Sequence, residues 1–264
     1  INRSSNTQLD ASEMNGFRYW SVEHTLNQIE QLASLGVKNL KFADELFVLN
    51  PRHFGAICQG IIEKGFDLNI WAYARVDTCK PEYLNLLREA GVRWLGLGIE
   101  NPDRDRRKLI HKEGFEDINI IDLISRVRGS DINVGGNYIF GLPGDDIDSL
   151  NSTLAFAKEN LTEMVNFYCA MAYPGSPLYR KAVSDGVALP SSYEGYSQHS
   201  YETLCLPTDS LSAADILAFR DKAWSDYHDN QSYHELLRSR FGAHAVEQLN
   251  KTRGKTLKRK LLGD

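Results

Sequence analysis

The sequence lacks long apolar runs and contains only four cysteines in 264 residues. No run approaches the roughly 20 apolar residues of a membrane-spanning helix, and the first residues lack the apolar core of a secretion signal. We therefore expect a cytoplasmic protein with no membrane partner. The cysteines form no Cys-x-x-Cys pair, which excludes a local metal or redox site of that kind and predicts reduced structural thiols. They are Cys58, Cys79, Cys169 and Cys205.

Several catalytic and binding motifs are also missing. No Gly-x-Gly-x-x-Gly follows an early strand, which argues against a dinucleotide-binding fold. The seven histidines show no metal-ligand spacing, no lysine ends a strand, and no Gly-x-Ser-x-Gly occurs, so a metal hydrolase, a Schiff-base aldolase or a serine hydrolase is disfavoured. The net charge of −5 excludes nucleic acid as the expected partner. Six bases between Lys251 and Lys260 are interpreted as a solvated helix end rather than a phosphate-binding patch.

Five apolar segments alternate with helical patterns. The strands are expected at 37–43, 66–74, 92–99, 134–140 and 165–172. The helices between and before them are expected at 21–36, 51–65, 81–91, 116–127 and 148–159, mostly begun by Pro or Ser and ended by Gly. This order predicts an α/β protein with a parallel sheet. A doubly wound sheet is the alternative. Polar residues follow the end of several expected strands, as they do at the functional rim of a barrel, so a barrel is favoured.

The chain divides into three parts on this pattern. Residues 1–20 are expected to form a loop or arm, and 21–185 a partial barrel. Residues 186–264 are expected to form a long loop and a C-terminal helical extension, with one helix capped by Ser212 and two more at 233–241 and 243–249. A loop of charged residues is expected at 103–108.

The stretch 134–145 combines an apolar strand with a Gly-Leu-Pro-Gly turn. Gly135 and Gly136 lie inside the strand, where glycine is unfavourable unless something approaches the backbone closely. Gly141 and Gly144 hold open the loop before the next helix. Gly136 and Gly141 would let a flat base lie against the backbone, although an ordinary strand-to-helix connection would use the same residues.

Charged side chains stand at the ends of three expected strands. Glu45 could accept hydrogen bonds from an ammonium group, or pair with a helix lysine. Arg75 could bind a carboxylate or a phosphate, or pair with Asp77. Glu100 could accept from two vicinal hydroxyls of a ribose, or cap the following turn. Together they suit a ligand with an amino acid, a sugar and a base.

Five motifs in this order resemble the radical S-adenosylmethionine (radical SAM) superfamily. The resemblance is to its cobalamin-binding-type members and to their methylthiotransferase and oxygen-independent coproporphyrinogen relatives, and it covers roughly residues 17–180. The segments that carry it are Phe42–Phe47, Tyr73–Asp77, Gly96–Glu100, Tyr138–Gly144 and Tyr173–Tyr179.

The resemblance implies a six-stranded partial TIM-like barrel whose first strand is missing here. It implies that S-adenosylmethionine binds with its amino group at Glu45 and with its carboxylate and ribose at Arg75 and Glu100. The resemblance also implies that Tyr138, Ile139 and Gly141 belong to the strand that contacts adenine, and that Tyr173 belongs to the last strand.

The departure from the family is the absence of Cys-x-x-x-Cys-x-x-Cys, whose thiolates hold a 4Fe-4S cluster. The chain begins with Ile1 rather than Met, and no cysteine precedes Cys58. We therefore expect a fragment with no metal ligands of its own and with unknown catalytic residues. The full protein would be an enzyme that cleaves S-adenosylmethionine to a 5′-deoxyadenosyl radical.

The resemblance also implies the partners of the full protein. They are a small-molecule substrate that the sequence does not identify and an electron donor such as flavodoxin or ferredoxin. Methyl transfer through cobalamin would require a further N-terminal domain. The alternative is a non-catalytic relative that binds S-adenosylmethionine and has lost the cluster.

Overall fold

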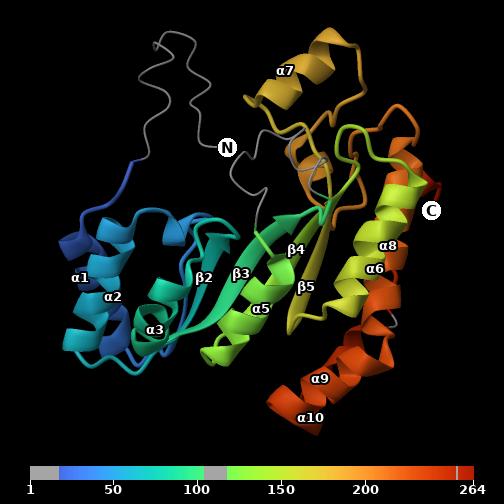
Figure 1. The fold of residues 1–264 in the computed structure, drawn as a ribbon. Helices are drawn as coiled ribbons and strands as arrows, with labels where there is room; N and C mark the ends of the chain where they lie inside the picture. Colours follow the sequence, from blue (N-terminus) through green and yellow to red (C-terminus); the bar gives the residue numbers. More distant parts are fainter. Residues whose placement is uncertain (1–17, 104–117, 254) are drawn as a thin grey trace, which may run out of the picture. The chain divides into compact units, whose positions relative to one another are not determined.

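The computed structural model describes residues 18–103, 118–253 and 255–264 (Figure 1). It contains two compact units. The N-terminal unit holds Tyr19–Tyr138 and Asn160–Asn166, and the C-terminal unit holds Ile139–Glu159 and Phe167–Asp264. The expected arm at 1–20, the charged loop at 103–108 and the start of the helix expected from 116 lie wholly or partly outside the described residues. The three-part division of the chain stays a prediction.

The described residues confirm the α/β prediction. They form a five-stranded sheet in the order β1-β2-β3-β4-β5, and the pairs from β1 to β4 are parallel. The strands are β1 (Asn39–Lys41), β2 (Asn69–Arg75), β3 (Val92–Glu100), β4 (Asn133–Phe140) and β5 (Met164–Cys169). The helices that connect them are α2 (Pro51–Glu63), α3 (Pro81–Glu89), α5 (Ile120–Gly129) and α6 (Ile147–Glu159). Because the paired strands run parallel, their carboxyl ends meet at one edge of the sheet.

The first three helices begin and end close to where the sequence predicts, whereas the helix expected over 116–127 begins at Ile120 and ends at Gly129. Ser21 caps α1 (Val22–Ser34) by accepting a hydrogen bond from the His24 N–H at 3.1 Å. Proline is the first residue of α2 and α3. The glycines that follow α1, α2 and α3 all adopt positive φ, as C′ glycines do.

The first strands are shorter than expected. The strand expected over 37–43 is limited to β1, since the chain stacks Phe42 on Phe47 with ring centroids 4.2 Å apart and then turns. The Asp44 carboxylate fixes this turn by accepting from the Leu46 N–H at 2.9 Å. The strand expected from residue 66 begins at Asn69 instead.

The core of the N-terminal unit lies between its strands and helices. In β2 the buried Ile70, Ala72 and Ala74 alternate with half-buried residues, as the period of two requires. The helices α1, α2 and α3 pack side by side along one flank (Figure 1). Their apolar faces bury Ile29, Phe54, Ile57, Ile61, Leu84 and Leu87.

The C-terminal unit is built around α8 (Ala213–His228), which packs against α6 (Figure 1). Ser212 and Asp215 form a capping box at its start. Phe140 contacts Phe167 and Phe219, with ring centroids 5.3 and 5.1 Å away. The expected helices near 233 and 243 are α9 (Gln231–Phe241) and α10 (Ala243–Arg253).

Three features of the C-terminal unit differ from expectation. A helix, α7 (Pro177–Ser184), follows β5, with Ser176 as its N-cap and Pro177 as its first residue. The long loop after it contains the short 3-10 helix η3 (Tyr193–Tyr196). A further 3-10 turn, η4 (Lys260–Leu262), follows α10 near the end of the chain.

The basic C-terminal segment is not only a solvated helix end. Arg259 is fully buried, although Lys258 and Lys260 beside it are exposed. Its guanidinium binds both oxygens of Asp221 on α8, at 2.8 and 2.9 Å. The interpretation fails at this residue because the carboxylate and nearby carbonyl groups replace water around the charge.

Candidate functional site

A polar and aromatic face runs across the strands of the N-terminal unit. The parallel register pairs Lys41 with Trp71, Trp71 with Trp94, and Tyr73 with Gly96. The two indole rings stack with centroids 5.3 Å apart, and the Lys41 ammonium lies 5.2 Å from the centroid of the Tyr73 ring. Half-buried side chains therefore fill the face of the sheet near its amino end, and the charged candidates lie further along toward the carboxyl end.

The chain's own side chains lie against the strand glycines. A Cβ added at Gly96 would lie 2.6 Å from the Tyr73 ring, and one at Gly135 would lie 3.0 Å from the Trp71 ring. At Gly136 the added atom would meet Thr162 and Tyr138, each at 3.0 Å. The close approach predicted at Gly135 and Gly136 is therefore real, but the groups that approach are protein side chains.

Arg75 ends β2 in a bidentate pair with Asp77. Its Nε donates to Asp77 Oδ1 at 2.9 Å, and its Nη2 donates to Oδ2 at 2.7 Å. The Thr78 hydroxyl accepts from the Arg75 backbone N–H at 3.2 Å. The pairing that the sequence left open is thus present, and it holds the guanidinium in a fixed orientation at the end of the strand.

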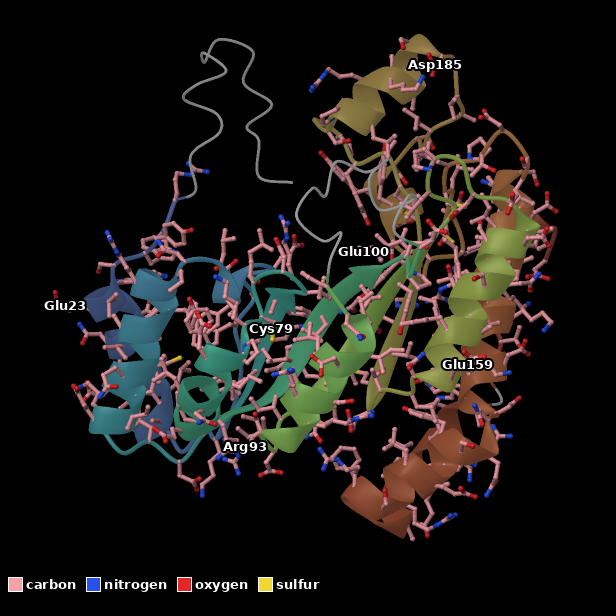
Figure 2. All side chains as sticks on the ribbon, viewed as in Figure 1. Glu23, Cys79, Arg93, Glu100, Glu159 and Asp185 are labelled. Atoms are coloured by element: carbon pink, nitrogen blue, oxygen red, sulfur yellow. The ribbon has the colours of Figure 1, made fainter. Side chains whose placement is uncertain are left out.

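Glu100 ends β3 with a left-handed backbone. Its φ is +65°, an uncommon value for a residue other than glycine, which costs about 1–3 kcal/mol. Its Oε1 lies 2.8 Å from the position of a Cβ added at Gly98, so the carboxylate turns back over that glycine. Gly98 is in register with Arg75, so Arg75 and Glu100 stand together at the carboxyl ends of β2 and β3. Figure 2 shows Glu100 at the end of the β3 arrow.

The other two candidates of the N-terminal unit differ in exposure. Glu45 lies on the exposed turn that follows β1. Tyr138 is fully buried in β4 and is in register with Glu100. The register therefore brings the backbone of Tyr138 next to that of Glu100, whereas it says nothing of Glu45, which lies beyond the paired residues of β1.

The remaining candidates belong to the C-terminal unit. Ile139 is half-buried in β4, and Gly141, the first residue after β4, adopts a φ of +77°. A Cβ at Gly141 would lie 3.0 Å from two carbons of Ile216 on α8, so this glycine allows the helix to approach. Tyr173 is 42% exposed and its ring lies 5.9 Å from that of Tyr196.

The Gly-Leu-Pro-Gly turn is organised by the aspartate that follows it. The buried Asp145 accepts from the Leu142 N–H and from the Ser149 hydroxyl, both at 2.9 Å. Its backbone carbonyl accepts from the Thr208 hydroxyl at 2.8 Å. Sequence reasoning named the glycines of this turn but not Asp145, nor Asp146, which caps α6 by accepting from the Ser149 N–H at 2.9 Å.

Two asparagines were underrated by sequence reasoning. The Asn166 amide donates to the Asn137 side-chain oxygen at 2.9 Å, and the Asn137 amide donates to the Leu97 carbonyl at 3.1 Å. This network ties β5, β4 and β3 together on the face that carries Arg75. The Trp71 indole N–H is buried on the same face with no hydrogen-bond partner among the described residues.

The cysteines do not fit an iron–sulfur cluster. All four are free, buried and carried by different segments, and the described residues include no group of three possible metal ligands. Burial raises the pKa of Cys58 and of Cys79 to about 12, so neither is a ready thiolate ligand. All four cysteines are thus unpaired, buried thiols in this structure. Among the described helices, none is long and apolar enough to span a bilayer.

Comparison with known proteins adds a family match. The sequence model of the radical SAM superfamily matches residues 6–157, which is more than half of the chain. An uncharacterized methyltransferase of Pyrococcus horikoshii is 26% identical over 182 residues, which cover 69% of this chain and 39% of that protein.

Two solved structures share the fold. One is the radical S-adenosylmethionine methyltransferase TsrM of Kitasatospora setae, with cobalamin and a 4Fe-4S cluster bound; its TM-score is 0.57 at 17% identity, over 69% of this chain and 35% of that chain. The other is the cobalamin-dependent S-adenosylmethionine radical enzyme OxsB, with a TM-score of 0.58 at 16% identity, over 90% of this chain and 41% of that chain. The chain thus spans between 35% and 41% of the length of these three proteins.

Proposed function

Because the chain belongs to the radical SAM superfamily, we propose that it binds S-adenosylmethionine and forms the cofactor-binding part of a radical methyltransferase. The methyltransferase of Pyrococcus horikoshii and TsrM support the choice of methyl transfer within the superfamily. The substrate would be a small molecule, and electrons would come from a donor such as flavodoxin or ferredoxin.

The observation that carries the proposal is the backbone of Glu100. A left-handed glutamate at the end of a parallel strand is strained, and such strain persists where surrounding structure and function require it. The strained φ orients the carboxylate at the strand end, beside Arg75 of the neighbouring strand. An ionised carboxylate there can accept hydrogen bonds from both hydroxyls of a ribose.

The other candidates would bind the remaining parts of the cofactor. Arg75, kept in position by Asp77, would donate to the methionine carboxylate. Glu45 would accept from the methionine ammonium, and its exposed turn leaves it accessible. These residues bind and orient the cofactor, which supplies the methyl group or the 5′-deoxyadenosyl radical when it is bound.

A second candidate function follows from the cysteines. Since they do not fit a cluster, the chain alone would bind S-adenosylmethionine without iron and without radical chemistry. The DNA upstream of Ile1 separates the two candidates. An in-frame Cys-x-x-x-Cys-x-x-Cys supports the methyltransferase, and the longer protein, reconstituted anaerobically with iron and sulfide, should then produce 5′-deoxyadenosine. A start codon without cysteines supports the binding protein.

Calorimetric titration of the purified chain with S-adenosylmethionine tests the binding itself. We expect saturable one-to-one binding that Glu100→Gln weakens by about 10- to 100-fold, since hydrogen bonds to charged groups contribute roughly 1.5–3 kcal/mol. Glu89→Gln on α3 is the matched control, because that glutamate is exposed and lies outside the candidate site. Binding that is absent, or that is equally strong in both variants, contradicts the proposal.

A further inference from the structure

Two of the four cysteines lie against each other in the C-terminal unit. Cys169 is the last residue of β5, and Cys205 lies in the extended segment before α8. The Leu206 N–H donates to the Ala170 carbonyl at 3.0 Å, so the two segments are joined directly beside the cysteines. The thiols of Cys169 and Cys205 are neighbours that interact electrostatically, and the Cys205 thiol donates to the Ala213 carbonyl at 3.2 Å.

The surrounding hydrogen bonds keep the two segments together. The Gln198 side chain accepts from the Cys169 N–H at 2.9 Å and donates to the Cys169 carbonyl at 3.0 Å. The backbone carbonyl of Gln198 in turn accepts from the buried Arg259 guanidinium at 3.0 Å. The contact between the thiols is therefore part of an ordered, buried arrangement and not a chance meeting of loops.

The two thiols differ in acidity. The neighbouring Cys169 thiol lowers the pKa of Cys205, the positive charge of Arg259 lowers it further, and burial and Asp221 act in the opposite direction. The interaction with Cys205, together with burial, raises the pKa of Cys169. The directions of the two pKa shifts favour ionisation of Cys205 over Cys169. No neighbouring group lowers the pKa of Cys58 or Cys79, so these two thiols serve as internal references.

We propose that Cys169 and Cys205 form a redox pair that a small two-electron oxidant such as hydrogen peroxide converts into a disulfide. The Cys205 thiolate attacks one peroxide oxygen, the O–O bond breaks, and the product is a sulfenic acid with water after proton uptake. The sulfur of Cys169 then attacks the sulfenic sulfur, the S–S bond forms and the S–O bond breaks. The thiol proton of Cys169 leaves with the hydroxyl as a second water, so two thiols and one peroxide give one disulfide and two waters.

The disulfide would fasten the segment before α8 to the end of β5. The non-covalent link at this point now consists of the Gln198 and Leu206 hydrogen bonds. A covalent link between residues 169 and 205 would restrict the segment between them, which contains α7 and η3. Both sulfurs are buried, so the pair would respond to small oxidants and not to bulky thiol reagents.

Mass spectrometry of the oxidised chain tests the proposal, because trypsin places each cysteine in its own peptide. After hydrogen peroxide treatment, free thiols are alkylated in denaturant and the chain is digested without reduction. The four peptides span 53–64, 76–88, 159–180 and 182–220. We expect a cross-link between the last two with a loss of about 2 Da, and thiol loss about tenfold or more faster at Cys169 and Cys205 than at the reference cysteines.

Two variants sharpen the outcome. Cys205→Ser should abolish the cross-link, whereas Cys58→Ser should retain it at the wild-type rate. The wild-type map needs no variant and therefore stands even if a substitution prevents folding. Three results overturn the proposal: all four thiols stay alkylatable at equal rates, Cys205 gains oxygen atoms without a cross-link, or the cross-link joins other cysteines.

Discussion

Replacing Arg259 by methionine tests how the end of the chain is held. The guanidinium is 0% exposed and donates to five oxygen atoms. Two of these belong to Asp221, and the others belong to the Ser200 carbonyl, the Thr203 hydroxyl and the Gln198 carbonyl. Methionine fills part of the volume but leaves these acceptors without their donor.

The size of the stability loss depends on which hydrogen-bond partners Asp221 keeps in the variant. Burial alone would raise the pKa of Asp221, but hydrogen bonds from Arg259 and Arg220 hold it below its usual value. In the variant, Arg220 still donates to Asp221 at 2.7 Å, so the carboxylate is not left alone. Removing one partner of a buried ion pair costs roughly 3–5 kcal/mol, and we expect the lower end, about 3 kcal/mol.

Thermal denaturation and hydrogen exchange measure this loss. We expect a fall of about 6–12 °C in Tm, since 1 kcal/mol shifts Tm by roughly 2–4 °C at this size, and faster exchange in residues 197–206. Lys260→Met is the matched control: its side chain is 63% exposed and pairs with Glu202 at the surface, so this variant should unfold at nearly the wild-type temperature. Equal effects of the two substitutions would refute the reasoning.

Three further predictions concern the two units separately. Glu163→Gln should destabilise the N-terminal unit by about 2–4 kcal/mol in urea titration, because the buried carboxylate pairs with Arg128 of α5 and accepts a hydrogen bond from the Val134 N–H in β4. The control Glu159→Gln, at an exposed position, should change the stability little. Gly135→Ala should cost about 1–3 kcal/mol, since the new methyl group meets an indole ring at 3.0 Å, whereas Gly129→Ala in open space should not destabilise. Burial lowers the pKa of His228. The neutral imidazole therefore contributes its full stability above the unfolded pKa, near 6.5, and this contribution is lost as the pH falls through the lower folded pKa. Urea midpoints of the C-terminal unit that stay constant from pH 7.5 to pH 5.5 would contradict this.

Local chemistry explains which elements the sequence predicts well. Caps such as Ser21 and the glycines after the helices act within a few residues, so they are visible in the sequence. The alternation of strands and helices also follows from local patterns. Helix α7 carried the same Ser-Pro start signal, but it follows the last strand, where the repeat that guided the other assignments ends.

Long-range pairing explains what the sequence could not predict. Arg259 is buried only because Asp221 and the loop at 198–203 surround it, and nothing near it in the sequence indicates this. Glu163 likewise depends on Arg128, 35 residues away. The candidate residues Arg75 and Glu100 were found because they stand at strand ends, yet the Asp77 pair and the left-handed backbone required the structure.

The central claim is that separate residues recognise the amino acid and the nucleoside of S-adenosylmethionine. The most direct test compares this ligand with 5′-methylthioadenosine, which lacks the amino acid, by calorimetry on the chain and on Glu45→Gln and Glu100→Gln. The account predicts that Glu100→Gln weakens both ligands, whereas Glu45→Gln weakens S-adenosylmethionine alone. Equal loss of both ligands in both variants, or no effect of Glu100→Gln on 5′-methylthioadenosine, would contradict it.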